Sequence, residues 1–210
     1  ISVSAERAIT PGSLLVGPFA GQMAHGEVTH GGLKRVATEW IDGQYQGAVF
    51  RFTQGLEGGV NRASIGPDGA SYTGGVCSNG NWSHQGNVWY GLDRLEYNGH
   101  DVFEPLAIHA KTNGIEIRFT QPLADGVGGD GDDYLIEQFR YEPTPAYGGP
   151  KLDEERLVPA SVTISDDRRS VFLELDDLRS GHVLYLRLFG PWKSANGDSL
   201  WTSEAWYTMN

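Results

Sequence analysis

The clearest strand pattern of the chain lies in residues 114–134, GIEIRFTQPLADGVGGDGDDY. Ile115, Ile117 and Phe119 alternate with polar residues, which is typical of a β-strand that buries one of its two faces. The pattern ends at Pro122, and a loop of glycines and aspartates follows. We therefore expect a β-sheet with a hydrophobic core against one face and an acidic loop at the end of one strand.

Short strand patterns of this kind recur through the second half of the chain. They fall at 106–110, 115–120, 134–141, 161–165, 171–175, 183–188 and 206–209. A series of short strands separated by turns is typical of an antiparallel, immunoglobulin-like β-sandwich. The proline-rich segment 142–160 interrupts the series, and we expect it to lie on the surface with one helical turn at 153–157.

The first half of the chain is richer in hairpin signals. The dipeptide Asp42-Gly43 separates predicted strands at 33–41 and 44–52, and it suits a two-residue hairpin turn. A second turn is predicted at 67–69, PDG, because proline presets one turn position and glycine accepts the positive φ of another. The rhythm changes near residue 99, which predicts two domains, 1–99 and 100–210.

Composition narrows the class of protein. The chain has 210 residues with 39% hydrophobic residues, 29 glycines and a formal net charge of −11, which favours a β-rich protein and argues against a nucleic-acid partner. Its single cysteine, Cys77, excludes an intrachain disulfide and a four-cysteine zinc site. The sequence has no CxxCH haem-attachment motif and no apolar run of the roughly 18–20 residues that a membrane span needs.

The acidic loop is the sharpest chemical feature. Asp125, Asp130, Asp132 and Asp133 are separated by glycines that let the backbone turn several carboxylates toward one point. Ca²⁺ takes about six to eight oxygen ligands, so these four aspartates are a candidate calcium site. The alternative interpretation is a solvated acidic loop at the edge of a sheet.

A second candidate site consists of aromatic residues. Trp82, Trp89 and Tyr90 fall in a polar, glycine-rich loop, where large rings are harder to bury than on a strand. An exposed planar ring can stack against the apolar face of a sugar, so the three residues are candidate carbohydrate ligands. The alternative is that these rings pack at the junction between the two halves of the chain.

No catalytic group is indicated by a motif. The sequence has no GxSxG element, and its carboxylates show no signature that would bring two of them to a glycosidic bond.

Several long segments resemble the C-terminal part of large secreted bacterial proteins that join a sorbosone-dehydrogenase-like or glucose-dehydrogenase-like β-propeller to an immunoglobulin-like domain. Such proteins often carry c-type cytochrome and carbohydrate-binding modules as well. The resemblance lies in FEPLAIHAKTNGIEIRFTQPL, YEPTPAYGGPKLDEERL, SDDRRSVFLELDDLRSGHVLYLRL and LWTSEAWYTMN, and, for the end of the propeller, in GEVTHGGLKRVATEWIDGQYQGAVFRFTQGLEGGVNRASIGPDGASYTGG and NWSHQGNVWYGLDRL.

The resemblance implies an all-β chain in which an N-terminal, partial propeller-like hairpin unit packs on a C-terminal immunoglobulin-like antiparallel β-sandwich. A propeller needs at least about four blades of about 40 residues, so residues 1–99 cannot close one. The positions that would hold a catalytic base and a quinone in such dehydrogenases have no counterpart here, so we expect neither a quinone nor a haem.

From these observations we predict a non-catalytic accessory module of an extracellular or periplasmic multidomain redox or polysaccharide-utilisation protein. Its expected partners are neighbouring domains, and calcium is a candidate ligand. One alternative is a carbohydrate-binding module that uses the loop aromatics on a polysaccharide. Another is an incomplete fragment of a quinone-dependent sugar dehydrogenase. Exposed strand edges in the first half would also permit a homodimer.

Overall fold

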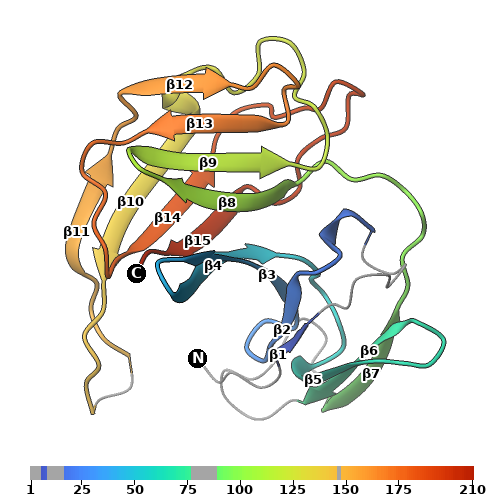
Figure 1. Cartoon of the computed structure of the whole chain (residues 1–210). Helices are drawn as coiled ribbons and strands as arrows, with labels where there is room; N and C mark the ends of the chain where they lie inside the picture. The colour runs from blue at the N-terminus through green and yellow to red at the C-terminus, as the bar shows by residue number, and fades with distance from the viewer. Residues whose placement is uncertain (1–5, 9–16, 77–88, 146–147) are drawn as a thin grey trace. The chain divides into compact units, whose positions relative to one another are not determined.

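The computed structural model describes residues 6–8, 17–76, 89–145 and 148–210. Within these ranges the chain is built almost entirely from β-strands in antiparallel sheets, none of which closes into a barrel, as Figure 1 shows. The described residues include two short 3-10 helices, η1 (Gly17–Phe19) and η2 (Gly131–Asp133). The predicted all-β class is confirmed. In the part of the chain that is described, no helix has the length and apolar character to cross a membrane.

The chain forms two compact units. The first unit comprises residues up to Val36 together with Phe50–Asp101, and the second comprises Ala37–Val49 and Val102–Asn210. The second unit thus includes part of a hairpin that the sequence analysis placed in the N-terminal domain. The hairpin groups with the sandwich because β4 pairs with β15 and Gln46 of β4 donates a hydrogen bond to the Tyr207 hydroxyl of β15.

The first unit contains two sets of paired strands. Its strands are β1 (Glu6–Ala8), β2 (Met23–Glu27), the start of β3 (Gly32–Ile41), the end of β4 (Gln44–Arg51), β5 (Gly59–Ile65), β6 (Ser71–Val76) and β7 (Tyr90–Leu95). Strands β5, β6 and β7 form a three-stranded sheet, and β1 and β2 pair in order with β3. The turn predicted at 67–69 lies between β5 and β6, as expected. Leu33, Leu56 and Val60 form a buried cluster in this unit.

The second unit is an antiparallel β-sandwich of two sheets. One sheet has the order β12 (Ser161–Ile164), β13 (Ser170–Glu174), β9 (Gly114–Phe119) and β8 (Pro105–Lys111). The other continues from β3 and β4 to β15 (Glu204–Thr208), β14 (Val183–Leu188), β10 (Tyr134–Arg140) and β11 (Leu152–Leu157). All seven strands predicted in the second half of the sequence are present.

Alternating residues of both sheets supply the core of the second unit. Ile115, Ile117 and Phe119 of β9 are buried, as their spacing predicted. Phe119 stacks on Trp192 with ring centroids 5.5 Å apart, and Trp192 meets the edge of Tyr134 on β10 at the same separation. This aromatic series connects the two sheets. Complete burial of one such large side chain contributes about 1.5–3 kcal/mol to folding.

The β3–β4 hairpin has the predicted turn. Asp42 and Gly43 both have positive φ, 49° and 82°, as a two-residue type I′ turn requires. The outward-facing Gly47 of β4 is needed for a different reason. A Cβ there would lie 2.1 Å from the carbonyl oxygen of Ala37, so no side chain fits.

The helical turn predicted at 153–157 is wrong, because this segment is strand β11. Glu155 and Arg156 pair with Gln138 and Glu137 of β10. The segment is polar because β11 is an edge strand that leaves half of its side chains exposed to solvent. Pairing with β10 therefore overrides the weak helical preference of the local sequence.

Candidate functional site

The four aspartates of the acidic loop do not all face one point. Asp125 forms an ion pair with Arg168, which also donates from Nη2 to the carbonyl oxygen of Ala124. Asp130 caps the helix η2, because its Oδ1 accepts a hydrogen bond of 3.0 Å from the backbone N–H of Asp132. In the described residues, no group of three or more His, Cys, Asp or Glu side chains is arranged to hold a metal ion.

The loop is nevertheless held firmly by the sandwich. The hydroxyl of Tyr134 donates to the carbonyl oxygen of Gly128 at 2.6 Å, and a Cβ at Gly128 would lie 2.9 Å from the ring of Trp192. The backbone N–H of Phe189 donates to the carbonyl oxygen of Asp133 at 2.8 Å. These contacts fix the backbone that carries Asp133.

Negative charges meet around Asp133. Partial burial, followed by the charges of Asp130 and Asp132, raises the pKa of the Asp133 carboxyl above its usual value. The structure therefore brings three of the four predicted ligands close enough to repel one another, whereas Asp125 is neutralised by Arg168.

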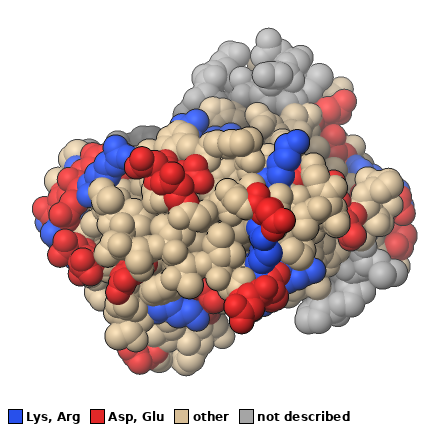
Figure 2. Space-filling model, turned by 90° about the horizontal axis from the view of Figure 1, so that it is seen from above, with Lys and Arg blue, Asp and Glu red and all other residues tan. Residues whose placement is uncertain are grey.

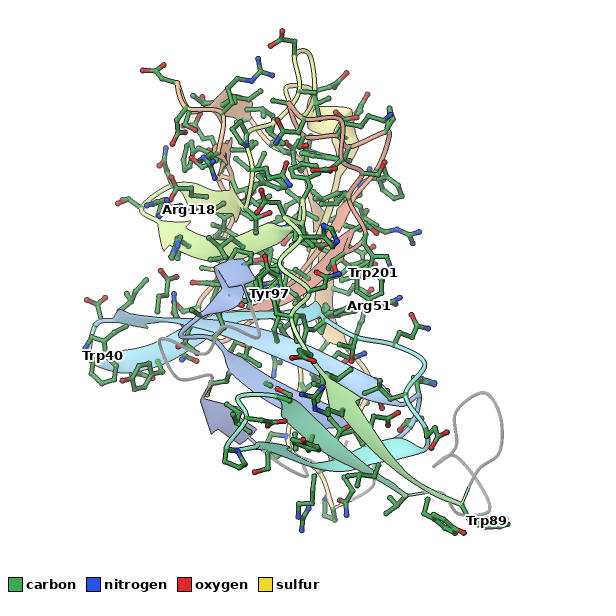
Figure 3. The ribbon with its side chains drawn as sticks, turned by 90° about the vertical axis from the view of Figure 1, so that its right-hand side faces the viewer. Trp40, Arg51, Trp89, Tyr97, Arg118 and Trp201 are labelled. Atoms are coloured by element: carbon green, nitrogen blue, oxygen red, sulfur yellow. The ribbon has the colours of Figure 1, made fainter. Side chains whose placement is uncertain are left out.

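The predicted aromatic site is described in part. Trp82 lies outside the described residues. Trp89 and Tyr90 are 61% and 82% exposed at the start of β7, and Figure 3 shows Trp89 there. Tyr90 is part of a strand rather than a loop, because it pairs with Val76 of β6. Both rings can therefore reach a ligand in solvent.

A half-buried carboxylate that the sequence analysis missed, Glu39, lies where the β3–β4 hairpin meets β8 and β15. Glu39 accepts hydrogen bonds from the Tyr207 hydroxyl and, at 2.9 Å, from the backbone N–H of Ala110, while its second oxygen lies 2.9 Å from His109 Nδ1. Gln46 Nε2 donates to the Tyr207 hydroxyl oxygen at 2.5 Å. We call Glu39, Gln46, His109 and Tyr207 the Glu39 cluster.

The Glu39 cluster favours an ionised carboxylate. Burial opposes ionisation, but the hydrogen bonds from Tyr207, Ala110 and His109 outweigh it and hold the pKa of Glu39 below its usual value. Burial, followed by the hydrogen bond to Glu39, raises the pKa of the Tyr207 phenol. The proton therefore stays on the tyrosine, which donates to a charged acceptor.

Glu104 is a second carboxylate that connects distant segments of the backbone. It is 9% exposed, and its two oxygens accept hydrogen bonds from the backbone N–H groups of Trp201 (3.3 Å) and Thr202 (3.0 Å). Its own backbone N–H donates to Thr120 Oγ1 at 3.0 Å. Glu104 thus joins the start of β8 to the loop that precedes β15. No local sequence signal marks it, because the N–H groups that donate to it lie far along the chain.

On one face of the molecule, the charged side chains of the described residues are mixed rather than segregated. On the face seen in Figure 2, Lys and Arg lie beside Asp and Glu among the described residues, and they do not gather into a basic patch.

Comparison of the chain with protein-family models, with curated proteins and with solved structures gives no significant match.

Proposed function

We propose that the chain is a non-catalytic accessory β module of an extracellular multidomain redox or polysaccharide-utilisation protein, with neighbouring domains as its partners. The observation that supports this role is that two carboxylates with little solvent exposure bind backbone groups of the fold. Glu39 and Glu104 both accept hydrogen bonds from backbone N–H groups, so their charge joins strands and loops. Carboxylates held in this way stabilise a module.

Sugar oxidation by the whole chain tests this proposal. We expect no reduction of an electron-accepting dye with glucose, sorbosone or xylose, in the presence of added quinone and calcium, beyond the rate without protein. Turnover that depends on the quinone would instead support the alternative of a dehydrogenase fragment and would overturn the accessory role.

Carbohydrate binding through Trp89 and Tyr90 is a second candidate function. It is supported by the exposure of both rings and of Leu92, which is 74% exposed on the same strand.

In the described part of the chain, β7 has a hydrogen-bonded neighbour on one side, β6, so its other edge could also pair with a second copy. Sedimentation velocity at increasing protein concentration separates dimerisation from sugar binding.

Calcium binding is proposed for Asp130, Asp132 and Asp133. Partial burial and, after it, the charges of Asp130 and Asp132 raise the pKa of Asp133, and a cation there would offset those charges. We expect the melting temperature to rise in millimolar calcium and to fall in EDTA, and Asp133→Asn to reduce this response. An unchanged melting temperature in both conditions would discard the site.

The raised pKa of Asp133 gives a separate expectation without calcium. A carboxyl whose pKa is higher in the folded state stabilises that state at low pH, and this stabilisation is lost as the pH rises through the folded-state pKa. In EDTA, Asp133→Asn should therefore melt at a higher temperature than the parent protein at pH 7. The difference should vanish near pH 3. Asp125→Asn is the control, because it removes a partner of Arg168 and should not stabilise.

A further inference from the structure

The outer face of the larger sheet in the second unit carries four aromatic residues on consecutive strands. Glu39 and Gln46 point inward, so Trp40 of β3 and Tyr45 of β4 point outward. The same alternation directs Trp206 of β15 outward, between buried Ala205 and Tyr207. On β14 it directs Tyr185 outward between two buried leucines. We call Trp40, Tyr45, Tyr185 and Trp206 the outer aromatic face.

The four rings of this face are in contact as two pairs. Trp40 and Tyr45 meet at a centroid distance of 4.5 Å and an interplanar angle of 72°, and they are 61% and 69% exposed. Tyr185 and Trp206 are cross-strand partners with centroids 5.4 Å apart. Figure 3 shows Trp40 on its strand. An edge-to-face contact holds a ring in place but leaves much of its apolar surface in water. This exposure is unfavourable, and a ligand that stacks on the ring would remove it.

The charges beside the rings compensate each other. Arg187 of β14 is the register partner of Glu204 of β15, so one positive and one negative residue stand opposite each other. The Tyr185 hydroxyl donates to Glu204 Oε1 at 2.6 Å, and partial burial and this hydrogen bond raise the pKa of Tyr185 to about 12. Glu137 of β10, the register partner of Tyr185, lies on the same face, and its carboxylate is 3.9 Å from Lys151 Nζ. The face next to the rings is therefore close to neutral on a chain whose net charge is −11.

A neutral face of flat rings with hydrogen-bonding groups beside them matches an uncharged ligand that alternates apolar faces and hydroxyls. A polyanion would be repelled by the acidic chain, and a polycation would meet the positive charge of Arg187 directly opposite Glu204. Gly47, the next outward position of β4 after Tyr45, bears no side chain that would obstruct an extended ligand.

We propose that the outer aromatic face binds an uncharged polysaccharide, with sugar rings stacked on Trp40 and Tyr45. The Tyr185–Trp206 pair supplies a second contact on the neighbouring strands. This inference rests on the accessory role proposed above and adds a ligand to it, at a site different from Trp89 and Tyr90.

Affinity electrophoresis in native gels tests the site, with hydroxyethylcellulose and neutral xylan as probes and polygalacturonate as the charged comparison. We expect the neutral polymers to retard the protein and Trp40→Ala to weaken this retardation by about tenfold or more, as for a central aromatic contact. Trp201→Ala is the matched control, because Trp201 is 54% exposed and lies outside the outer aromatic face, and it should bind like the parent protein.

Two further measurements keep the test decisive. Trp40→Phe retains a ring and should retain most of the binding even if the alanine variant is poorly folded. The tryptophan fluorescence of the parent protein should change on titration with cellohexaose or xylohexaose. The proposal is overturned if no neutral polymer retards the protein, if polygalacturonate retards it equally, or if Trp40→Ala binds as well as the parent. A loss confined to Trp89→Ala would place sugar binding on β7. Sugar oxidation, in contrast, would refute the accessory role and leave this binding result unchanged.

Discussion

Replacement of Glu104 by alanine is expected to lower the free energy of unfolding of the second unit by about 2–4 kcal/mol, because backbone N–H groups lose a charged acceptor. The N–H of Thr202 is the more consequential of the two, since Thr202 is 1% exposed and water cannot easily replace the carboxylate. The melting temperature should fall by roughly 5–15 °C. Thermal denaturation followed by circular dichroism measures both quantities.

Two variants calibrate this result. Glu104→Gln keeps one acceptor oxygen and loses the charge, so it should be intermediate. Glu142→Ala breaks an exposed ion pair with Arg140, 2.7 Å long, and it should change the free energy by less than about 0.5 kcal/mol. If Glu104→Ala were as mild as Glu142→Ala, the loop before β15 would be held by its other contacts and Glu104 would have no structural role.

Features that depend on local chemistry could be predicted from the sequence. The Asp42-Gly43 turn was predictable because few residue pairs accept positive φ at both positions. The strand at 114–119 was predictable because alternating burial leaves a period of two in the sequence. Strand β11 shows the limit of this approach, because this edge strand exposes half of its side chains without strict alternation and so leaves no such period.

Features that depend on distant partners were not predictable. The acidic loop was visible, but the pairing of Asp125 with Arg168 crosses 43 residues and removes one predicted ligand. Glu39 and Tyr207 are separated by 168 residues, and neither has a local motif. The four rings of the outer aromatic face come from two strands near residue 43 and two near the C-terminus. Only the strand order brings them to one face.

Replacement of Glu39 by glutamine is expected to lower the free energy of unfolding by about 1.5–3 kcal/mol at pH 7, because hydrogen bonds to a charged acceptor become hydrogen bonds to a neutral one. The cost should depend on pH. The pKa of Glu39 is lower in the folded than in the unfolded chain, so its contribution is fully present above the unfolded-state value of about 4.3. It is lost as the pH falls through the folded-state pKa. Urea denaturation of both proteins from pH 7 to pH 3 should show two stability curves that converge in acid.

Tyr207→Phe provides an independent measure of the same cluster. It removes the hydroxyl that donates to Glu39 and accepts from Gln46, and we expect the free energy of unfolding to fall by about 1–2 kcal/mol. The double variant should lose less than the sum of the two single variants, because the two residues share one hydrogen bond. Additive losses would mean that the Tyr207 hydroxyl does not stabilise the carboxylate.

The matched control for the acid dependence is Glu137→Gln. Glu137 is a carboxylate on β10 whose nearest cationic group, Lys151 Nζ, lies 3.9 Å away, so its charge should matter little to stability. A profile for Glu39→Gln that runs parallel to the parent profile down to pH 3 would falsify the assignment, because Glu39 would then titrate alike in the folded and unfolded chains. Convergence for Glu39→Gln, with a parallel profile for Glu137→Gln, would instead locate the acid-sensitive contact at the hairpin. In that case the ionised Glu39 accepts the hydrogen bond from the N–H of Ala110 on β8, which is the edge strand of the smaller sheet. Protonation of Glu39 in acid would then weaken this hydrogen bond before the core of the sandwich is disturbed.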